Sequence, residues 1–515
     1  MSISKQGCDL RKLLQKWLTA LKYVSQFCIL FYPQNIDPLI SGGALQHLNP
    51  LLTDPVATIQ QSAAIAVGRL GNHAAVIADE MIALGMMNQI VKHLSHENKY
   101  FKKTASFVLR GIAKHSEKHA RAIVSLGAVP GLVSSLNDFE PSVKESAVWA
   151  LGYIARHSPE LAQTVVDAGA VPLLISCYRE PELALKRIAA STLSDIARHN
   201  EVLSKLVAEG GVLPQMVKDI DSTDVGLKRQ VTSCLAHVAK HSVESAEGIV
   251  ALDVLPRTIL ALKDLSEGVR KNSCILLRDI CRHSENLSKL VVSSGGVAGL
   301  SEILNEARGV NRIPAIMSLG YIAAFSETLA LAVIVTEAVT PLRNCLIDEP
   351  EDCVKGAAAW ALGQIGRHSP EHARALAENE VLRRLLAVHL HDDSSEDLKN
   401  KSKKSIKAIL SQLTVISQLE VMLTDSPPKI LKNVVRQLTK ILTNDISGRK
   451  QLVTSGSLQR VQKIQAEPDS KLAHAKNDLN TLYPAELVNF YSPQYPEELI
   501  KKLDALPAKP ARASA

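Results

Sequence analysis

The chain contains 515 residues, more than a single compact core accommodates, so it forms either several domains or an elongated array. Apolar residues at 46% and charged residues at 22% exclude wholesale disorder. The formal net charge of +7 is too small at this length to indicate nucleic-acid binding by itself.

Residues 1–32 predict a helix that caps the N-terminal end of the chain. They do not resemble a targeting segment. The apolar run from Trp17 to Tyr32 is short and interrupted by polar residues such as Lys22, so it predicts neither a membrane span nor a signal peptide. The eight cysteines contain no Cys-x-x-Cys pair, and those in the middle of the chain lie in apolar helical patterns. This usage is typical of reduced, buried thiols, so we expect a cytoplasmic protein.

Three sequence markers recur with one period of 42 residues. A histidine after a basic residue, a proline and a glycine each keep this spacing. The histidines are His115, His157, His199, His241 and His283; the prolines are Pro130, Pro172, Pro214 and Pro256; the glycines are Gly43, Gly85, Gly127, Gly169 and Gly211. A period of about 40–47 residues built from helices is typical of armadillo and HEAT repeats.

One repeat unit predicts three helices. Ser158 and Pro159 start a short helix that ends at Gly169, a second helix covers about 171–178, and a long third helix covers about 183–198. The short first helix and the glycine turn favour the armadillo type. We therefore predict an all-α fold, a right-handed armadillo-repeat superhelix (α-solenoid) with about eight three-helix repeats over residues 33–390.

Beyond residue 390 the repeat pattern weakens. Residues 391–467 predict degenerate armadillo repeats, because Lys429–Thr443 still reads as a third helix and Ser455-Gly456-Ser457 as the glycine turn. Residues 468–515 predict a C-terminal tail that is partly extended or disordered, since it is rich in proline.

The sequence predicts no enzyme. It contains no phosphate-binding loop, no dinucleotide fingerprint, no nucleophile elbow and no metal-spaced Cys/His cluster. The repeated histidines would lie one repeat apart, too far to share an ion, so we interpret them as caps of carbonyl groups at the ends of third helices. We therefore predict no catalytic, cofactor-binding or metal-binding residues.

Two third helices carry a string typical of peptide-binding armadillo proteins, Trp149-Ala150-Leu151-Gly152-Tyr153 and Trp360-Ala361-Leu362-Gly363-Gln364. It is similar to the Trp-Ala-Leu-x-Asn string of nuclear import adaptors, whose asparagine grips an extended basic peptide. Here the asparagine position holds other residues, which argues against import-adaptor function. They are Arg69, Gly111, Tyr153, Asp195, His237, Asp279, Tyr321 and Gln364.

A more regular feature is a stripe of cations at the start of the third helices. We name it the basic stripe: Lys102, Lys103, Lys144, Lys186, Arg187, Lys228, Arg229, Arg270, Lys271, Arg312 and Lys355. Either the acidic loop just upstream of each helix neutralises it, or it binds an acidic partner such as an acidic protein tail. Nucleic acid is a poorer partner, because the stripe lacks interleaved aromatics. The basic run Lys399–Lys407 reads as a solvated helix face, and no lipid-anchor motif indicates membrane binding.

Several segments between residues 33 and 496 resemble an armadillo family of the ciliary and flagellar central apparatus. They include Pro33-Gln34-Asn35-Ile36, Phe107-Val108-Leu109-Arg110, residues 182–191, residues 360–368, Lys401-Ser402-Lys403-Lys404 and Tyr491-Ser492-Pro493-Gln494-Tyr495. The resemblance implies a non-enzymatic scaffold of the axoneme, required for motility. Its implied partners are other central-apparatus proteins, microtubules (directly or indirectly) and further copies of itself. The alternative is a cytoplasmic armadillo adaptor that binds a peptide or protein cargo, for transport or adhesion.

Overall fold

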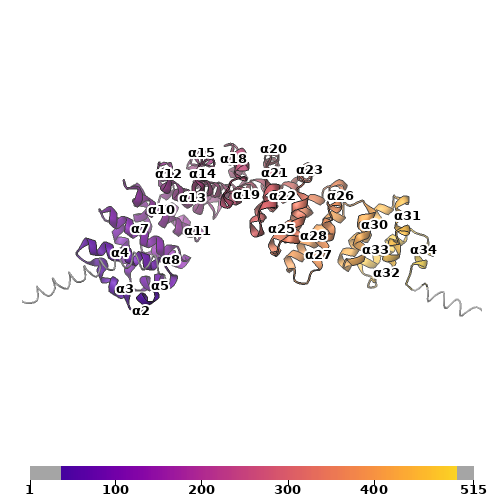
Figure 1. The fold of residues 1–515 in the computed structure, drawn as a ribbon, viewed down its shortest axis with the longest axis horizontal. Helices are drawn as coiled ribbons and strands as arrows, with labels where there is room; N and C mark the ends of the chain where they lie inside the picture. The colour runs from indigo at the N-terminus through magenta and orange to yellow at the C-terminus, as the bar shows by residue number, and fades with distance from the viewer. Residues whose placement is uncertain (1–35, 494, 496–515) are drawn as a thin grey trace, which may run out of the picture. The chain divides into compact units, whose positions relative to one another are not determined.

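The computed structural model describes residues 36–493 and residue 495, and within this range it contains helices and no strands. The helices, many of them labelled in Figure 1, form two compact units, residues 1–283 and 284–515. The predicted capping helix of residues 1–32 lies outside the described residues. The all-α repeat architecture predicted from the sequence is confirmed in both units.

Unit 1 repeats a triplet of two short helices and one long helix. Each long third helix packs against the third helix of the next triplet, so these helices form one continuous layer, the third-helix layer. The third helices are α4 (Ala57–Gly71), α7 (Lys99–Ala113), α10 (Pro141–Ala155), α13 (Leu183–Ala197), α16 (Val225–Ala239) and α19 (Glu267–Cys281). The first helices are α2 (Ile36–Ser41), α5 (Ala75–Ala83), α8 (Glu117–Ser125), α11 (Pro159–Asp167), α14 (Glu201–Glu209) and α17 (Val243–Val250). The second helices are α3 (Ala44–Leu48), α6 (Met86–Lys92), α9 (Ala128–Ser134), α12 (Ala170–Arg179), α15 (Leu213–Asp219) and α18 (Val254–Ala261), with 3-10 turns η2 (Pro50–Thr53), η3 (His93–Ser95) and η4 (Ser135–Asn137).

Unit 2 continues the triplets with more variation. The first three comprise α20 (Glu285–Ser293), α21 (Gly296–Glu306), η5 (Gly309–Arg312) and α22 (Ile313–Phe325); α23 (Glu327–Val335), α24 (Val339–Asp348) and α25 (Asp352–Gly366); and α26 (Pro370–Glu378), α27 (Val381–Leu390) and α28 (Glu396–Leu410). A pair without a first helix follows, α29 (Ile416–Asp425) and α30 (Pro428–Leu442). The described chain ends with α31 (Ile446–Thr454), α32 (Ser457–Lys463), α33 (Lys471–Asn480) and α34 (Ala485–Phe490).

Local chemistry explains where each helix starts and stops. The Ser158 hydroxyl accepts a hydrogen bond from the Leu161 amide at the start of α11, and Pro159 occupies the first turn. Gly169 then turns the chain with φ of 80°, a left-handed conformation that glycine adopts without a Cβ penalty. The predicted helix boundaries of this repeat are confirmed.

The same left-handed turn persists where glycine is missing from the pattern. Asp253, Glu337 and Glu380 occupy that position in their repeats with φ of 60°, 57° and 56°. Tertiary packing of the flanking helices therefore holds a non-glycine residue in a conformation that costs about 1 kcal/mol.

The C-terminal predictions are confirmed for two elements. α30 matches the predicted third helix, and Gly456 makes the expected left-handed turn, with φ of 74°. The segment assigned to a tail contributes two helices among its described residues, α33 and α34. Ser470 caps α33, and Leu472, Ala475 and Leu479 form its buried face against α30.

Buried cysteines contribute to the interior, as predicted, with one exception. Cys177, Cys234, Cys274 and Cys345 are buried, and burial raises the pKa of the Cys234 thiol to about 12. Cys353 is exposed, because it is the second residue of α25 and lies on the solvent side of that helix. The prediction of a buried thiol is wrong for this cysteine.

Candidate protein-docking surface

In four consecutive third helices, α7, α10, α13 and α16, a lysine near the start forms an ion pair with an acid of the next repeat. Lys102 Nζ lies 3.0 Å from Asp138 Oδ2, Lys144 Nζ 2.5 Å from Glu180 Oε1, and Lys228 Nζ 2.7 Å from Asp264 Oδ2. In each of these three pairs the acid follows the lysine by 36 residues, so it belongs to the loop of the next repeat. Because the side chains are only about a quarter exposed or less, these pairs fasten neighbouring triplets together.

The predicted intramolecular neutralisation is therefore present, but the predicted partner was wrong by one repeat. We expected the acidic loop just upstream of each third helix to pair with that helix. In a stack, the start of a third helix instead faces the corresponding loop of the following repeat. Lys186 also pairs with the next repeat, but its partner at 2.8 Å is Asp219, the last residue of α15, and Asp219 also accepts a hydrogen bond from the Tyr178 hydroxyl.

The remaining stripe residues divide into engaged and exposed side chains. Arg187 makes a bidentate contact with Asp224 at 2.7 and 2.6 Å, and Arg270 donates to the Asp264 carbonyl at 2.8 Å. Arg312, in unit 2, is buried and lies 2.6 Å from Glu349. The side chains of Lys103, Arg229, Lys271 and Lys355 form no ion pair with any residue that the structure describes; the first three are exposed, and Lys355 is half-buried. The acidic-partner role of the basic stripe stays a prediction, and the exposed members are the ones free to serve it.

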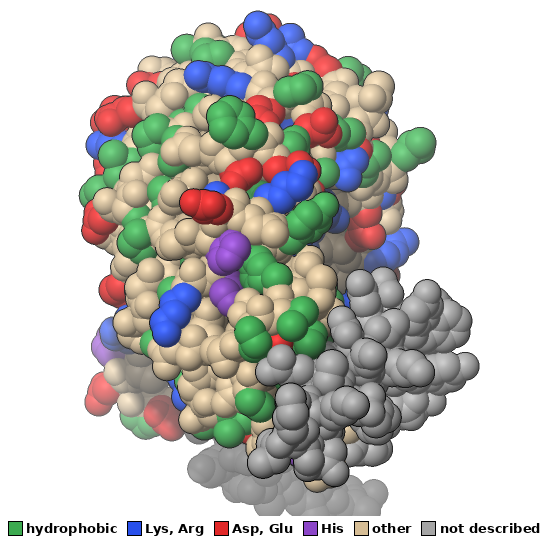
Figure 2. All heavy atoms as spheres, turned by 90° about the vertical axis from the view of Figure 1, so that its left-hand side faces the viewer, with side chains coloured by type: hydrophobic (Ala, Val, Ile, Leu, Met, Phe, Trp, Pro, Cys, Tyr) green, Lys and Arg blue, Asp and Glu red, His purple; other side chains and the backbone are tan. Residues whose placement is uncertain are grey.

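The charged surface has the mixed character that such pairing produces. On the face shown in Figure 2, basic and acidic side chains lie interspersed, with apolar side chains between them. A surface of this kind makes short-range contacts with a partner. It does not produce an electrostatic potential of one sign that extends far into the solvent.

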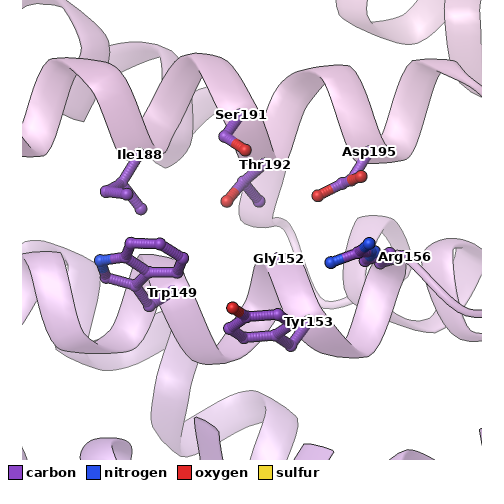
Figure 3. Close-up of a pocket in the computed structure, with 8 residues that line it drawn as sticks. All are labelled: Trp149, Gly152, Tyr153, Arg156, Ile188, Ser191, Thr192 and Asp195. Atoms are coloured by element: carbon purple, nitrogen blue, oxygen red, sulfur yellow. The ribbon is translucent and has the colours of Figure 1, made fainter. Parts of the chain in front are cut away.

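A shallow aromatic cleft lies between α10 and α13 on the third-helix layer. Trp149 and Tyr153 of α10 stack with ring centroids 5.7 Å apart and an interplanar angle of 19°. Figure 3 shows them facing α13, across a cleft of about 60 Å³. Its lining comprises Trp149, Gly152, Tyr153, Arg156, Ile188, Ser191, Thr192 and Asp195. Gly152 is required there, since a Cβ at this position would lie 2.6 Å from the Thr192 hydroxyl oxygen.

Arginines from the protein itself cover the aromatic rings of this cleft. The Arg110 guanidinium lies 5.0 Å from the centre of the Trp149 ring and 5.5 Å from that of Phe107, and Arg156 lies 6.0 Å from that of Tyr153. These are cation–π contacts. A cationic peptide side chain therefore meets ring faces that are already occupied, which agrees with the missing asparagine ladder.

Asp195 faces Arg156 across the cleft (Figure 3). Burial raises the pKa of Asp195 to about 6, while the charges of Arg156 and Arg198 act in the opposite direction. The cleft thus places the Asp195 carboxyl group opposite the Arg156 guanidinium, beside the Trp149 and Tyr153 rings, and its volume is far below that of ligand-binding clefts.

A buried polar cluster continues along the same layer at α13, α16 and α19. The Ser194 hydroxyl lies 2.9 Å from His237 Nδ1 and 3.0 Å from the Ser233 hydroxyl. Asp279 is fully buried and accepts two hydrogen bonds from Arg278, at 2.9 and 2.8 Å. Burial lowers the pKa of His237 to about 4, so the imidazole is neutral at physiological pH. The sequence located these positions but gave no indication that they interact.

The repeated histidines cap carbonyl groups, as predicted, but on the preceding repeat. Nε2 of His115, His157 and His199 lies 2.6, 2.7 and 2.7 Å from the carbonyl oxygens of Gly71, Ala113 and Ala155, at the ends of α4, α7 and α10. His283 and His368 repeat the contact at 2.7 and 2.6 Å. Each histidine thus joins one triplet to the triplet before it.

The residues that the structure describes contain no group of three His, Cys, Asp or Glu side chains placed to hold a metal ion. No single described helix is long and apolar enough to cross a membrane, although three bent helix pairs reach that length and composition together.

Comparison with known proteins supports the fold and one resemblance. Residues 116–156 and 158–198 match the model of the Armadillo/beta-catenin-like repeat. The crystal structure of an engineered protein superposes with a TM-score of 0.68 at 22% identity, covering 85% of this chain and 98% of that one, which shows the α-solenoid fold alone.

Among curated proteins, Sperm-associated antigen 6 of Homo sapiens is 52% identical over 164 residues, and that of Mus musculus is 51% identical over 164 residues. Each match covers 32% of this chain and 32% of the relative, so the chain matches about a third of each relative's length. The resemblance drawn from the sequence motifs is confirmed over that stretch.

Proposed function

We propose that this protein is a non-enzymatic structural scaffold of the axonemal central apparatus, associated with central-pair microtubules, that docks projection proteins and is required for ciliary or flagellar motility. The observation that carries the proposal is the 52% identity to Sperm-associated antigen 6 over 164 residues. The sequence motifs at positions 33–36, 360–368 and 491–495 extend the same resemblance beyond one segment.

A docking role is supported because one set of side chains joins the repeats and another set stays accessible to partners. Ion pairs and histidine caps fasten each triplet to its neighbours, which gives the third-helix layer a fixed spacing. The exposed cations Lys103, Arg229 and Lys271 of the basic stripe, and the half-buried Tyr153, are then available for other proteins. A scaffold of this kind needs rigid presentation and no chemical step.

Localisation with biochemical fractionation tests the proposal. A tagged full-length chain expressed in ciliated cells is expected along the axoneme, and it should remain in the axonemal pellet after detergent extraction. Cells that lack the protein should beat with reduced motility and recover when the chain is restored. A pool that is wholly released by detergent would overturn the proposal.

The basic stripe is proposed as a contact for an acidic partner protein. Because Lys186 and Lys228 are engaged in ion pairs, the exposed members Lys103, Arg229 and Lys271 are expected to dominate this contact. Reversing these three to Glu should release the chain from axonemes at lower salt than wild type. If retention of the chain on axonemes is unchanged across the salt range, the basic stripe does not bind an acidic partner and has only a structural role.

The alternative function is a cytoplasmic adaptor that binds a peptide or protein cargo. The aromatic cleft at Trp149 and Tyr153 favours it, since that position carries peptide ligands in import adaptors. The covering arginines Arg110 and Arg156 predict that a basic localisation peptide binds poorly. Micromolar or tighter binding of such a peptide, abolished by Trp149→Ala, would favour the adaptor instead.

A further inference from the structure

A basic cleft in unit 2 belongs to none of the surfaces described above. It lies where the start of α30 meets the loop before α33, and its volume is about 640 Å³. This falls within the range of ligand-binding clefts, about 300–1,000 Å³. The lining comprises Pro428, Lys429, Lys432, Gln465, Ala466, Glu467, Ser470, Lys471 and Leu472.

Cations from three helices gather around this cleft. Lys429, Lys432 and Arg436 follow one face of α30 at spacings of three and four residues, and α28 and α33 add further basic side chains. None of these side chains forms an ion pair with a residue that the structure describes, in contrast to the paired cations of unit 1. We call the set the basic cleft cluster: Lys429, Lys432 and Lys471, which line the cleft, and Lys403, Lys407 and Arg436, whose charges act on Lys432.

The cluster crowds like charges together. Partial desolvation lowers the pKa of Lys432, and the neighbouring charges of Lys471, Arg436, Lys407 and Lys403 lower it further. Crowded cations repel one another at a cost to the free protein, and a bound anion relieves that repulsion. The start of α30 also directs the positive end of its helix dipole toward the cleft.

The lining distinguishes between classes of anion. It contains no aromatic side chain on which a nucleic-acid base could stack. Pro428, Ala466 and Leu472 offer apolar contact to aliphatic groups, and Gln465 and Ser470 can hydrogen-bond to a peptide backbone. These features match spaced carboxylates on an extended peptide better than a polyphosphate.

We propose that the basic cleft cluster binds an acidic, glutamate-rich peptide segment of a partner protein. Its carboxylates lie against the lysines of α30 and α33, and its backbone lies against Gln465 and Ser470. This site is separate from the basic stripe and was not identified from the Lys399–Lys407 run, because the decisive cations come from helices that are distant in sequence. The proposal goes beyond the axonemal function and does not depend on it.

Fluorescence polarisation with purified full-length chain tests the proposal. The probe is a fluorescein-labelled peptide of about ten glutamates, titrated from low to physiological salt. The test variant is Lys429→Gln, Lys432→Gln, Lys471→Gln. The matched control removes three exposed cations outside the cleft in the same unit, Arg383→Gln, Lys450→Gln and Arg460→Gln. Circular dichroism establishes that both variants retain the helix content of the wild type.

The proposal predicts that the test variant binds the peptide about tenfold more weakly than wild type, while the control stays within about twofold. Equal weakening in both variants would reduce the effect to net charge and overturn the proposed site. Absence of peptide binding by the wild type would also overturn it. Tighter binding of a single-stranded oligonucleotide with the same number of charges would assign the cleft to nucleic acid instead. Because the assay uses no axonemes, its failure leaves the proposed localisation unaffected.

Discussion

Arg312 provides the sharpest test of how the repeats are held together. Arg312 is 3% exposed and its partner Glu349 is 4% exposed, with Nη1 and Oε1 2.6 Å apart. Arg312 Nε also donates to the Ala307 carbonyl at 2.7 Å, and Glu349 accepts from the Gly309 amide at 3.0 Å. This pair is the buried counterpart of the exposed and half-buried pairs in unit 1.

Replacing Arg312 with methionine keeps the length and apolar stem of the side chain but removes its charge. Glu349 is then left buried with the Gly309 amide as its remaining donor, so we expect a loss of about 3–5 kcal/mol in the free energy of unfolding. Replacing Glu349 with leucine in the same chain removes the stranded charge. The double variant should therefore recover most of the loss, to within about 2 kcal/mol of wild type.

Urea unfolding followed by circular dichroism measures the midpoint shifts, and hydrogen exchange at α22 and α24 locates the effect. Local exchange is needed because a repeat protein of this length does not unfold in one step. Lys289→Met is the control, since it breaks an exposed pair with Glu285 in the same unit and should cost less than about 1 kcal/mol. The reasoning is wrong if Arg312→Met costs no more than this control, or if the double variant is as unstable as the single one.

Three further predictions follow from single positions. Gly169→Ala should lower the free energy of unfolding by about 1 kcal/mol, although the space beside Gly169 is open, and Asp253→Gly should raise it by a similar amount. Urea midpoints measure both changes, and changes of opposite sign would contradict the left-handed turn. Gly320→Ala should destabilise unit 2 by about 1–3 kcal/mol, because its Cβ would meet the Trp360 ring, and hydrogen exchange at α22 and α25 should rise. Since burial lowers the pKa of His237 from 6.5 to about 4, its stabilisation is complete above pH 6.5 and is lost as the pH falls toward 4. His237→Gln should therefore lose less stability than wild type between pH 7 and pH 4.5, and an equal loss would contradict the assignment.

The repeat architecture could be predicted because its signals are local. The proline in the first turn, the glycine turn and the apolar spacing of the third helix lie within one repeat, as the α11–α13 triplet shows. At Asp253 the glycine signal is absent and the turn still forms, because the flanking helices impose it. Local patterns therefore identify the unit, and packing maintains it where the pattern fails.

The contacts between repeats were harder to predict because their partners are distant in sequence. Lys102 lies close in the chain to acids of its own repeat, yet it pairs with Asp138, 36 residues later. His157 caps a carbonyl 44 residues earlier. A periodic sequence contains several candidate partners at regular offsets, and only the stacking geometry selects one. The basic cleft cluster has no repeat signal at all, since α28, α30 and α33 contribute at unrelated spacings.

A cryo-EM map of intact axonemes that contain the tagged chain would test the central claim most directly. The account predicts density for stacked helical triplets at the central apparatus, with the third-helix layer in contact with another protein. The account would be contradicted if the central apparatus contained no density for the chain. It would also be contradicted if all the third helices faced solvent while another surface of the chain made the contacts.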